Sequence, residues 1–290
     1  MSHHARVTPT ETRAALEQLG LRPSRALGQN FLVDQNIARL IVDAADLRST
    51  DTVLEIGPGL GALTELLLER AGRVVAVEKD ARLHEFLLSR FSRRRKLEVV
   101  HADALVVDTA PWAPFKVVAN LPYSISTPIL TRLVESPARP PLMVLTLQRE
   151  VGDRLAAAPR TKEYGALTLY TQLYYDVRRA HLISPSCFMP APGVESAVMT
   201  LRLAPHPLLE PELEAPFKQL VRAGFGQRRK MLRGVLPKSE LGGWIKSDTL
   251  ESVLARIGLP RTARAEELSL AQWLQLTRIL TAQSPPTAQP

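Results

Sequence analysis

Short apolar runs and helix-like spacings alternate along the first half of this chain. The runs are rich in Val, Leu and Ile, as is typical of strands covered on both faces, and between them apolar residues recur every three or four positions. The predicted strands are Val53–Ile56, Val74–Val77, Leu97–His101, Val117–Ala119 and Leu142–Leu147, and the predicted helices lie at 37–45, 63–71, 82–91 and 128–135. This alternation predicts an α/β fold with a doubly wound parallel sheet and right-handed crossovers.

The pattern changes after residue 150. A helix is predicted at Gly165–Tyr175, followed by two strands, Val177–Ile183 and Glu195–Leu203, which a Pro-rich loop joins into an antiparallel pair at the edge of the sheet. Beyond the Ala204–Pro207 linker only helical patterns follow, at 211–225, 228–236, 247–257 and 265–280. We therefore expect a first domain over residues 1–204 with a flexible start at 1–20, a helical domain over 205–282 and a disordered tail over 283–290.

Composition narrows the choice of partners. The 290 residues carry a formal charge of +8 and a pI near 9.9, which favours a nucleic acid over a merely solubilising surface. The single cysteine, Cys187, excludes an internal disulfide or a cysteine zinc cluster and fits a reducing cytoplasm, where a small apolar role is expected for it. No apolar run is long enough to span a bilayer, and the N-terminus does not read as a secretory signal, so we expect a cytoplasmic protein with no membrane and no metal partner.

A glycine-rich turn follows the first predicted strand. Its spacing is Gly57-x-Gly59-x-Gly61, unlike the Gly-x-Gly-x-x-Gly of dinucleotide folds, and it suits a ligand without a pyrophosphate. Glu78 ends the second strand, where a carboxylate can accept from both hydroxyls of a ribose, and Asp103 ends the third, where it can accept from an adenine amine. This ordered set of strand-end residues, together with Asn120, favours S-adenosylmethionine over a nicotinamide cofactor.

The stretch Asn120-Leu121-Pro122-Tyr123 is suited to holding an unstacked nucleobase. The Asn120 side-chain oxygen and the Leu121 carbonyl can both accept from an exocyclic amine, Pro122 stiffens the turn and Tyr123 offers a face for stacking. Methyl transfer to such an amine is an in-line displacement that depends on positioning and needs no strong general base. A stacked platform of this kind offsets the cost of taking the base out of its helix.

Five motifs carry a resemblance to a known family. They are Ala26–Leu32, Glu55–Gly61, Asn120–Tyr123, Pro185–Pro190 and Gln227–Lys230. In this order, from about residue 21 to about residue 280, they resemble the ribosomal small-subunit (16S) RNA adenine dimethyltransferases. The resemblance implies a Rossmann-like, seven-stranded methyltransferase sheet and a monomer that uses S-adenosylmethionine. It also implies dimethylation of two adjacent adenosines near the 3′ end of 16S rRNA, within an immature 30S subunit late in assembly.

The resemblance also implies roles for single residues. The expected cofactor contacts are Gln29, Asn30, Leu32, Gly57, Gly59, Glu78, Lys79, Asp103, Ala104 and Asn120. The expected residues at the target base are Asn120, Leu121, Pro122, Tyr123 and Phe188. Phe188 would pack on the base opposite the Asn120–Tyr123 turn, although a plain core position is the alternative. Ser124, Gly224 and Gly226 depart from the family pattern and bear only on loop stiffness and fine RNA contacts.

A basic segment, Gln227–Arg233, begins one of the helices predicted in the second domain. Cations at a helix start oppose the helix dipole, so phosphate binding explains Arg228, Arg229, Lys230 and Arg233 better than stability does. For the run Arg93–Lys96, a solvated helix end is the favoured interpretation and RNA contact the alternative.

Other functions remain open on sequence alone. A large-subunit rRNA adenine methyltransferase of the antibiotic-resistance type shares the cofactor motifs, although Leu121, in place of an Ile, and the long basic helical domain speak against it. A non-catalytic ribosome assembly factor is a second alternative, and a nicotinamide dehydrogenase is a distant third.

Overall fold

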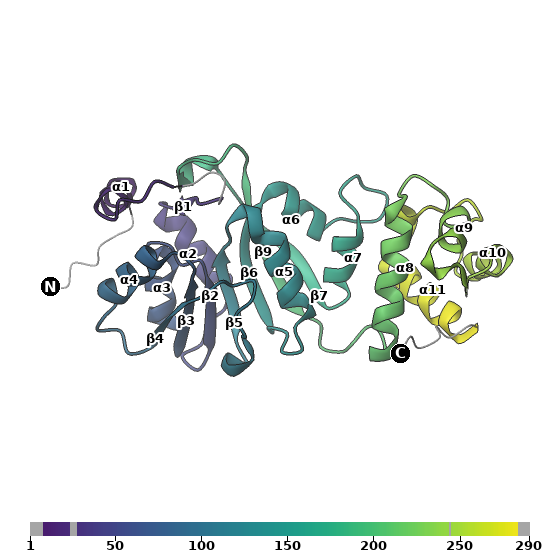
Figure 1. The fold of residues 1–290 in the computed structure, drawn as a ribbon, viewed down its shortest axis with the longest axis horizontal. Helices are drawn as coiled ribbons and strands as arrows, with labels where there is room; N and C mark the ends of the chain where they lie inside the picture. The colour runs from purple at the N-terminus through teal and green to yellow at the C-terminus, as the bar shows by residue number, and fades with distance from the viewer. Residues whose placement is uncertain (1–7, 24–27, 244, 284–290) are drawn as a thin grey trace. The chain divides into compact units, whose positions relative to one another are not determined.

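A computed structural model describes residues 8–23, 28–243 and 245–283, and the chain divides into two compact units. Unit 1 comprises Met1–Gly152 and Val177–Leu203, and unit 2 comprises Asp153–Asp176 and Ala204–Pro290 (Figure 1). One point of division, after Leu203, agrees with the predicted boundary. The other differs, because the sequence pattern placed Asp153–Asp176 in the first domain.

Tyrosine hydroxyls explain why Asp153–Asp176 belongs to unit 2. Tyr164 donates to the Leu268 carbonyl at 2.8 Å and Tyr170 to the Lys218 carbonyl at 2.9 Å. Tyr174 donates to the Glu214 carboxylate at 2.6 Å. Each bond joins residues far apart in sequence, which periodicity cannot reveal.

The sheet of unit 1 has the strand order β4-β3-β2-β5-β6-β9-β7. Its strands are β2 (Thr52–Ile56), β3 (Arg73–Glu78), β4 (Leu97–His101), β5 (Lys116–Asn120), β6 (Leu142–Gln148), β7 (Tyr175–Ile183) and β9 (Ser196–Leu203). Strands β2 to β6 pair in parallel, and β9 pairs with β6 in antiparallel register. The predicted doubly wound sheet with an antiparallel edge pair is confirmed. Strand β5 shows why the continuous apolar runs were informative, because Val117, Val118 and Ala119 are fully buried.

Four helices of unit 1 begin one or two residues before their predicted positions. They are α2 (Gln35–Asp43), α3 (Ala62–Arg70), α4 (Ala81–Arg90) and α5 (Ser126–Glu135), followed by α6 (Arg149–Leu155) (Figure 1). Asp34 caps α2 by accepting from the Asn36 and Ile37 amides, and Asp80 caps α4 in the same way. Each Val, Leu or Ile side chain that is buried between these helices and the sheet stabilises the fold by about 1.5–3 kcal/mol.

Helix α1 (Pro9–Gln18) occupies much of the segment expected to be flexible. A capping box between Thr8 and Glu11 starts it, and Leu16 packs in a buried cluster with Leu60 and Leu83 of the sheet unit. Residues 1–7 of the expected flexible start lie outside the described residues, as does 284–290 of the expected disordered tail.

Unit 2 is helical. It contains α7 (Ala166–Gln172), α8 (Glu214–Gly226), α9 (Leu232–Val235), α10 (Ser247–Arg256) and α11 (Leu270–Gln283). Helices α8 and α11 approach closely at Gly224, where a Cβ would stand 2.8 Å from the Trp273 ring. Gly224, a departure from the family pattern, therefore has a packing role. In the described chain no helix is long and apolar enough to cross a lipid bilayer.

The start of one predicted helix of unit 2, at residue 228, is wrong. Residues 228–230 form a turn after the end of α8, with the Lys230 amide donating to the Gln227 carbonyl at 2.8 Å. Met231 then forms an isolated antiparallel bridge with Arg264, and α9 begins only at Leu232. Pairing with a distant segment has replaced the local helical pattern.

Candidate functional site

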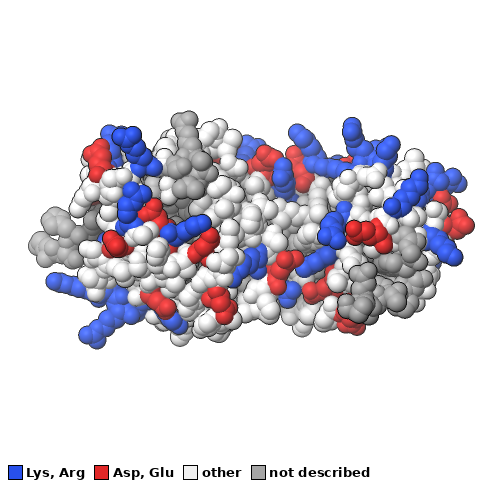
Figure 2. All heavy atoms as spheres, in the orientation of Figure 1, with Lys and Arg blue, Asp and Glu red and all other residues white. Residues whose placement is uncertain are grey.

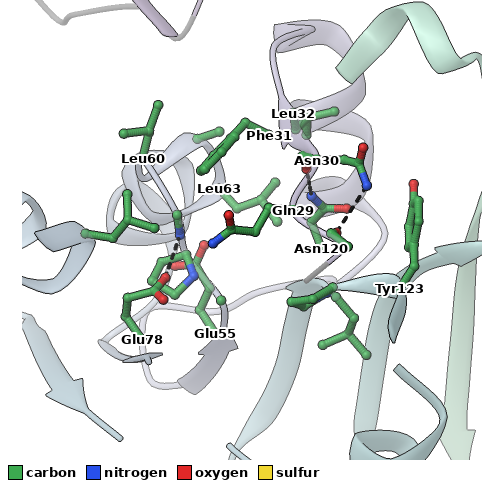
Figure 3. A pocket seen from close by; sticks show the side chains of 18 residues that line it. Gln29, Asn30, Phe31, Leu32, Glu55, Leu60, Leu63, Glu78, Asn120 and Tyr123 are labelled. Carbon is green, nitrogen blue, oxygen red and sulfur yellow. Dashed lines mark hydrogen bonds between the residues drawn. The ribbon is translucent and has the colours of Figure 1, made fainter. Parts of the chain in front are cut away.

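A pocket opens at the carboxyl ends of β2, β3 and β5 (Figure 3). Its lining includes Gln29, Asn30, Leu32, Gly57, Gly59, Glu78, Asn120, Leu121, Pro122 and Tyr123, which are all sequence-predicted site residues. The enclosed volume is about 80 Å³, below the range of roughly 300–1,000 Å³ usual for small-molecule sites. A nucleoside-sized ligand would therefore extend beyond these walls.

The glycine turn has the backbone conformation that its composition predicts. Gly57, Gly59 and Gly61 have φ values of 66°, 58° and 85°, a region that side chains rarely adopt. A Cβ on Gly61 would lie 2.7 Å from the Phe91 ring, and one on Gly59 would lie 3.1 Å from the Phe31 ring. With glycine at these positions, the backbone of the turn can approach a ligand more closely than it could with any other residue type.

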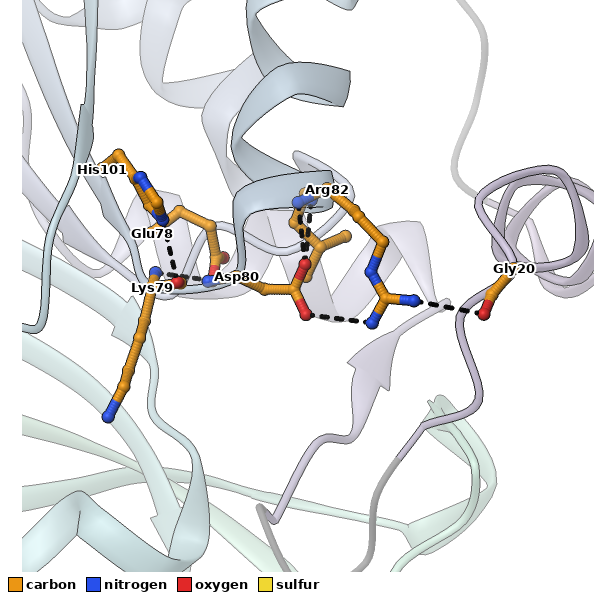
Figure 4. A network of polar contacts seen from close by, with 7 residues as sticks. Gly20, Glu78, Lys79, Asp80, Arg82 and His101 are labelled. Carbon is orange, nitrogen blue, oxygen red and sulfur yellow. Dashed lines mark hydrogen bonds and ion pairs between the residues drawn. The ribbon is translucent and has the colours of Figure 1, made fainter.

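Glu78 is fixed by backbone amides rather than by a cation. One carboxylate oxygen accepts from the amides of Lys79 at 2.8 Å and Asp80 at 3.0 Å, and the other accepts from Gly59 at 3.2 Å (Figures 3 and 4). Burial raises the pKa of Glu78, and these hydrogen bonds partly offset that effect. Two carboxylate oxygens have about four acceptor sites and three are used by these amides, so capacity remains for about one ribose hydroxyl.

A chain of polar contacts continues from Glu78 towards the N-terminal segment. Arg82 contacts the Asp80 carboxylate and donates to the Gly20 carbonyl at 3.2 Å (Figure 4). The segment that follows α1 is thereby tied to the strand end that carries Glu78. Ala26 and Leu27, from the first family-like motif, lie outside the described residues.

Asn120 holds the centre of the pocket. Its amide nitrogen donates to the Asn30 backbone carbonyl at 3.0 Å, and Asn30 in turn donates from its side chain to Gly28 at 3.1 Å (Figure 3). The Asn120 Oδ1 atom is buried and has no hydrogen-bond partner within the described chain. Such an orphan acceptor costs about 1–3 kcal/mol, so its presence beside a pocket points to a ligand donor.

Leu121, Pro122 and Tyr123 continue from the end of β5 as a rigid turn. The Leu121 amide donates to the Thr146 carbonyl of β6 at 3.3 Å, and the Pro122 ring lies 3.6 Å from where a Cβ on Gly57 would stand. The Tyr123 hydroxyl is hydrogen bonded to the Ser196 hydroxyl, and burial raises the pKa of Tyr123. Ser196, which starts β9, was not predicted, and nothing local in the sequence marks it.

Phe188 does not reach the pocket. It is 4% exposed and lies in β8 (Phe188–Met189), which pairs with Leu32 of β1 (Phe31–Leu32). Its ring packs in the main apolar core of unit 1. Phe188 therefore occupies a core position outside the lining of this pocket, and its packing on a target base stays a prediction.

Asp103, Lys79 and Ala104 lie at the neighbouring strand end, outside the described pocket lining. Lys79 donates to one Asp103 oxygen at 2.8 Å, and the Leu105 amide donates to the other at 2.9 Å. These contacts lower the pKa of Asp103, with the Lys79 hydrogen bond as the largest cause. Since Glu78 of β3 lies in register beside His101 of β4, Asp103 follows two residues after the position paired with Glu78.

The sequence interpretation missed Glu55. This residue of β2 is 1% exposed, lines the pocket and accepts from the Thr64 hydroxyl at 2.7 Å. Burial raises the pKa of Glu55 to about 8. A charged residue inside the apolar run Val53–Ile56 was the available signal.

The basic residues of unit 2 are divided by the structure. Arg228 donates to the backbone carbonyls of Thr161 and Lys162 and pairs with Glu266, so it serves the unit itself. Arg229, Lys230 and Arg233 instead line a separate cavity of about 750 Å³, which also includes Lys238, Arg264 and the single carboxylate of Glu251. Figure 2 shows the Lys and Arg side chains gathered on this part of unit 2.

Arg228, Arg229 and Lys230 follow the end of a helix, and the prediction that they begin one is wrong. The cations follow the C-terminal end of α8, where the helix dipole favours positive charge. They are therefore compatible with stability, and their interpretation as phosphate ligands depends on the cavity instead. Within it, the Arg233 Nη1 contacts Glu251 at 3.1 Å, while its buried Nε has no partner in the described chain.

Comparison with solved structures gives the same fold over most of the chain. A dimethyladenosine transferase from Plasmodium falciparum superposes with a TM-score of 0.78 at 25% identity, covering 87% of this chain and 98% of that one. The 23S rRNA methyltransferase ErmE superposes with a TM-score of 0.70 at 31% identity, covering 87% of this chain and 99% of that one.

Sequence relatives are similar over their whole length. Ribosomal RNA small subunit methyltransferase A of Geobacter metallireducens is 42% identical over 269 residues, covering 91% of this chain and 97% of the relative. The protein of that name from Geobacillus kaustophilus is 41% identical over 283 residues, covering 94% and 96%. The family model for ribosomal RNA adenine dimethylase matches residues 21–282. This chain, with its amide-lined pocket at the strand ends, belongs to the ribosomal RNA adenine dimethylase family.

Proposed function

We propose that this protein dimethylates two adjacent adenosines near the 3′ end of 16S rRNA, using S-adenosylmethionine, within an immature 30S subunit. The observation that carries the proposal is the buried, unpartnered Oδ1 of Asn120, held at the pocket by the Asn30 carbonyl. An acceptor fixed in this way fits an exocyclic amine, which has hydrogens to donate. The similarity to small-subunit methyltransferases at about 40% identity supports the choice of substrate.

The residues of the pocket fit the cofactor. Gly57 and Gly59 leave room for close approach, and Glu78 retains acceptor capacity for about one ribose hydroxyl. Asn30 and Leu32 would cover the cofactor, with Asp103 at its adenine end. When bound, S-adenosylmethionine supplies a methyl group on a positively charged sulfur.

Asn120, Leu121 and Tyr123 would prepare the base. The Asn120 Oδ1 and the Leu121 carbonyl would accept the two amine hydrogens, drawing the nitrogen lone pair out of the ring so that it is directed at the methyl group. Positioning of this kind contributes up to about 7–11 kcal/mol in favourable cases. Tyr123, whose ring is fixed through Ser196, would stack on the extruded base.

Tyr123 is unsuited to removing a proton. Burial raises the pKa of Tyr123, and the hydrogen bond to Ser196 offsets only part of that effect. The hydroxyl therefore stays protonated at neutral pH. The methylated ammonium product is acidic and releases its proton to solvent. A general base is accordingly unnecessary for the role that we assign to the site.

The basic cavity of unit 2 would bind the RNA backbone. Arg229, Lys230 and Arg233 line it, with Lys238 and Arg264 adding charge. Contacts from such side chains to phosphates position an RNA without reading its sequence, and they weaken as salt rises.

A second candidate is methylation of large-subunit RNA, favoured by the 31% identity to a 23S rRNA methyltransferase. Transfer of tritiated methyl groups separates the two. We expect incorporation into 30S particles from cells that lack this protein, and none into protein-free 23S RNA. Label in 23S RNA alone would favour the second candidate, and no label in either would leave an assembly factor without turnover.

A further inference from the structure

The turn that follows β4 carries Asp103, the residue proposed to meet the cofactor's adenine. The amides of Val106 and Val107 both donate to the Asp103 carbonyl at 3.0 Å, and the Leu105 amide donates to its carboxylate at 2.9 Å. The position of the carboxylate is thus coupled to the conformation of the whole turn, Asp103–Val107.

This turn lies over a cavity rather than over a packed helix. The cavity measures about 720 Å³ and is lined by Ala104 and Val107 of the turn, by Ile56 and Val77 of the sheet and by residues of α5. The next regular element along the chain is only the three-residue 3₁₀ helix Ala110–Trp112. The turn therefore borders open space on the side that faces the sheet and α5.

Arg132 of α5 spans this gap. Its Nη1 donates to the Ala104 carbonyl at 2.6 Å and its Nη2 donates to the Val107 carbonyl, so one guanidinium holds both ends of the turn. The planar fork of an arginine suits two carbonyls at once, which the point charge of a lysine does not. The charge of Arg132 near Asp103 also helps to lower the pKa of that carboxyl group, although less than the hydrogen bonds from Lys79 and the Leu105 amide.

We propose that Arg132 is a positioning residue for cofactor recognition: it holds the turn Asp103–Val107 so that the Asp103 carboxylate meets the adenine amine. The proposal rests on the proposed function, because it assumes that S-adenosylmethionine binds with its adenine at Asp103. In this role Arg132 would act through the Ala104 and Val107 carbonyls, without touching the cofactor or the methyl group.

The test measures binding of two cofactor products by calorimetry. S-adenosylhomocysteine has the adenine amine, and S-inosylhomocysteine has a carbonyl oxygen in its place. Arg132→Ala is expected to lower the affinity for S-adenosylhomocysteine about tenfold, which corresponds to losing one hydrogen bond to a charged group. The affinity of the same variant for S-inosylhomocysteine is expected to stay within about twofold of the wild-type value, because that ligand lacks the donor for Asp103.

Arg132→Lys is the second variant, and it is expected to behave like Arg132→Ala towards both ligands. Arg70→Ala is the control, since Arg70 forms an exposed ion pair with Asp43 on the α3 side of unit 1 and should change neither affinity. Hydrogen exchange at the Val106 and Val107 amides is expected to speed up in both Arg132 variants, which shows loosening of the turn directly. If Arg132→Ala does not fold, Arg132→Lys alone decides.

Equal weakening of the two ligands would overturn the proposal, because it would indicate a general structural role for Arg132. Unchanged affinity for S-adenosylhomocysteine, or full function in Arg132→Lys, would also overturn it. Failure of the wild-type protein to bind S-adenosylhomocysteine is a different result, which contradicts the proposed cofactor itself.

Discussion

The pocket of unit 1 and the basic cavity of unit 2 present opposite kinds of surface. The pocket offers backbone amides and carbonyls, the side-chain amide of Asn120 and the Glu78 carboxylate, with Asn120 and Glu78 held by hydrogen bonds. Around the cavity, a ligand meets five cationic side chains and one carboxylate. The first arrangement fixes atoms in place, whereas the second supplies charge with little geometric demand.

Each kind of surface matches the requirement of one step of the proposed reaction. A poor nucleophile must be held at a set angle and distance, which rigid neutral groups achieve without a solvation penalty at the moment of reaction. An RNA backbone offers many equivalent phosphates, for which mobile cations suffice. Changes in the pocket should therefore affect rate, and changes in the cavity should affect salt-dependent affinity.

The largest effect is expected for Asn120→Ala. Removing the side-chain acceptor should lower the single-turnover rate of methyl transfer by about a hundredfold or more, the usual scale for one preorganised group. RNA affinity, measured separately by filter binding, should stay unchanged. Asn36→Ala is the control, because Asn36 is an Asn on the exposed start of α2. A wild-type rate in Asn120→Ala would remove the distinction between the two regions.

Arg228 and Arg229 are neighbours in sequence, but we expect them to contribute differently to the stability of unit 2. Arg228→Ala removes the donors to Thr161 and Lys162 and leaves Glu266 without this partner, so we expect a loss of about 2 kcal/mol in the stability of unit 2. Arg229→Ala, at an exposed side chain, should leave the stability unchanged. Chemical denaturation of the two variants measures both. Equal stability would mean that the contacts of Arg228 contribute nothing.

Charge reversal in the cavity should act on RNA alone. The double variant Arg229→Glu and Lys230→Glu is expected to lower RNA affinity about tenfold and to reduce the slope of log affinity against log salt by about one per lost phosphate contact. Affinity for S-adenosylhomocysteine should not change. An unaltered salt slope would argue against these residues as phosphate ligands.

The smallest effect concerns Glu55 and is a dependence on pH. Burial raises its pKa from 4.5 to about 8, so between these values the folded protein keeps a proton that the unfolded chain releases. Stability from this group is therefore lost as pH rises through that window. Glu55→Gln stays neutral and can still accept from Thr64, so its melting temperature relative to wild type should rise by at least about 3 °C between about pH 5 and pH 8.

The matched control for that measurement is Glu69→Gln, at an exposed position of α3. Its difference from wild type should stay constant with pH. If the Glu55→Gln difference is also constant, Glu55 titrates normally in the folded protein.

The sequence predicted the strand-end groups well because their placement follows from chain direction. Carboxyl ends of parallel strands meet at one edge of a sheet, so Glu78 and Asn120 had to approach the glycine turn. The strands themselves were visible because both faces are buried, which leaves long apolar runs.

The remaining features depend on contacts between distant segments. Phe188 sits in a two-residue strand whose pairing with Leu32 decides that its ring faces the core. The helix predicted at 228–236 begins only at Leu232, because Met231 pairs with Arg264 and residues 228–230 form a turn. Arg228 reads as one more surface cation until the carbonyls of Thr161 and Lys162 are brought to it.

If the pocket holds the amine of an extruded adenine, the methyl groups must appear on that amine and nowhere else on the RNA. Immature 30S particles incubated with the protein and S-adenosylmethionine can be digested to nucleosides and their 16S rRNA mapped by mass spectrometry. We expect N6,N6-dimethyladenosine at two adjacent positions near the 3′ end. Methyl groups on a ring nitrogen, on a ribose hydroxyl or on no adenosine would contradict the account.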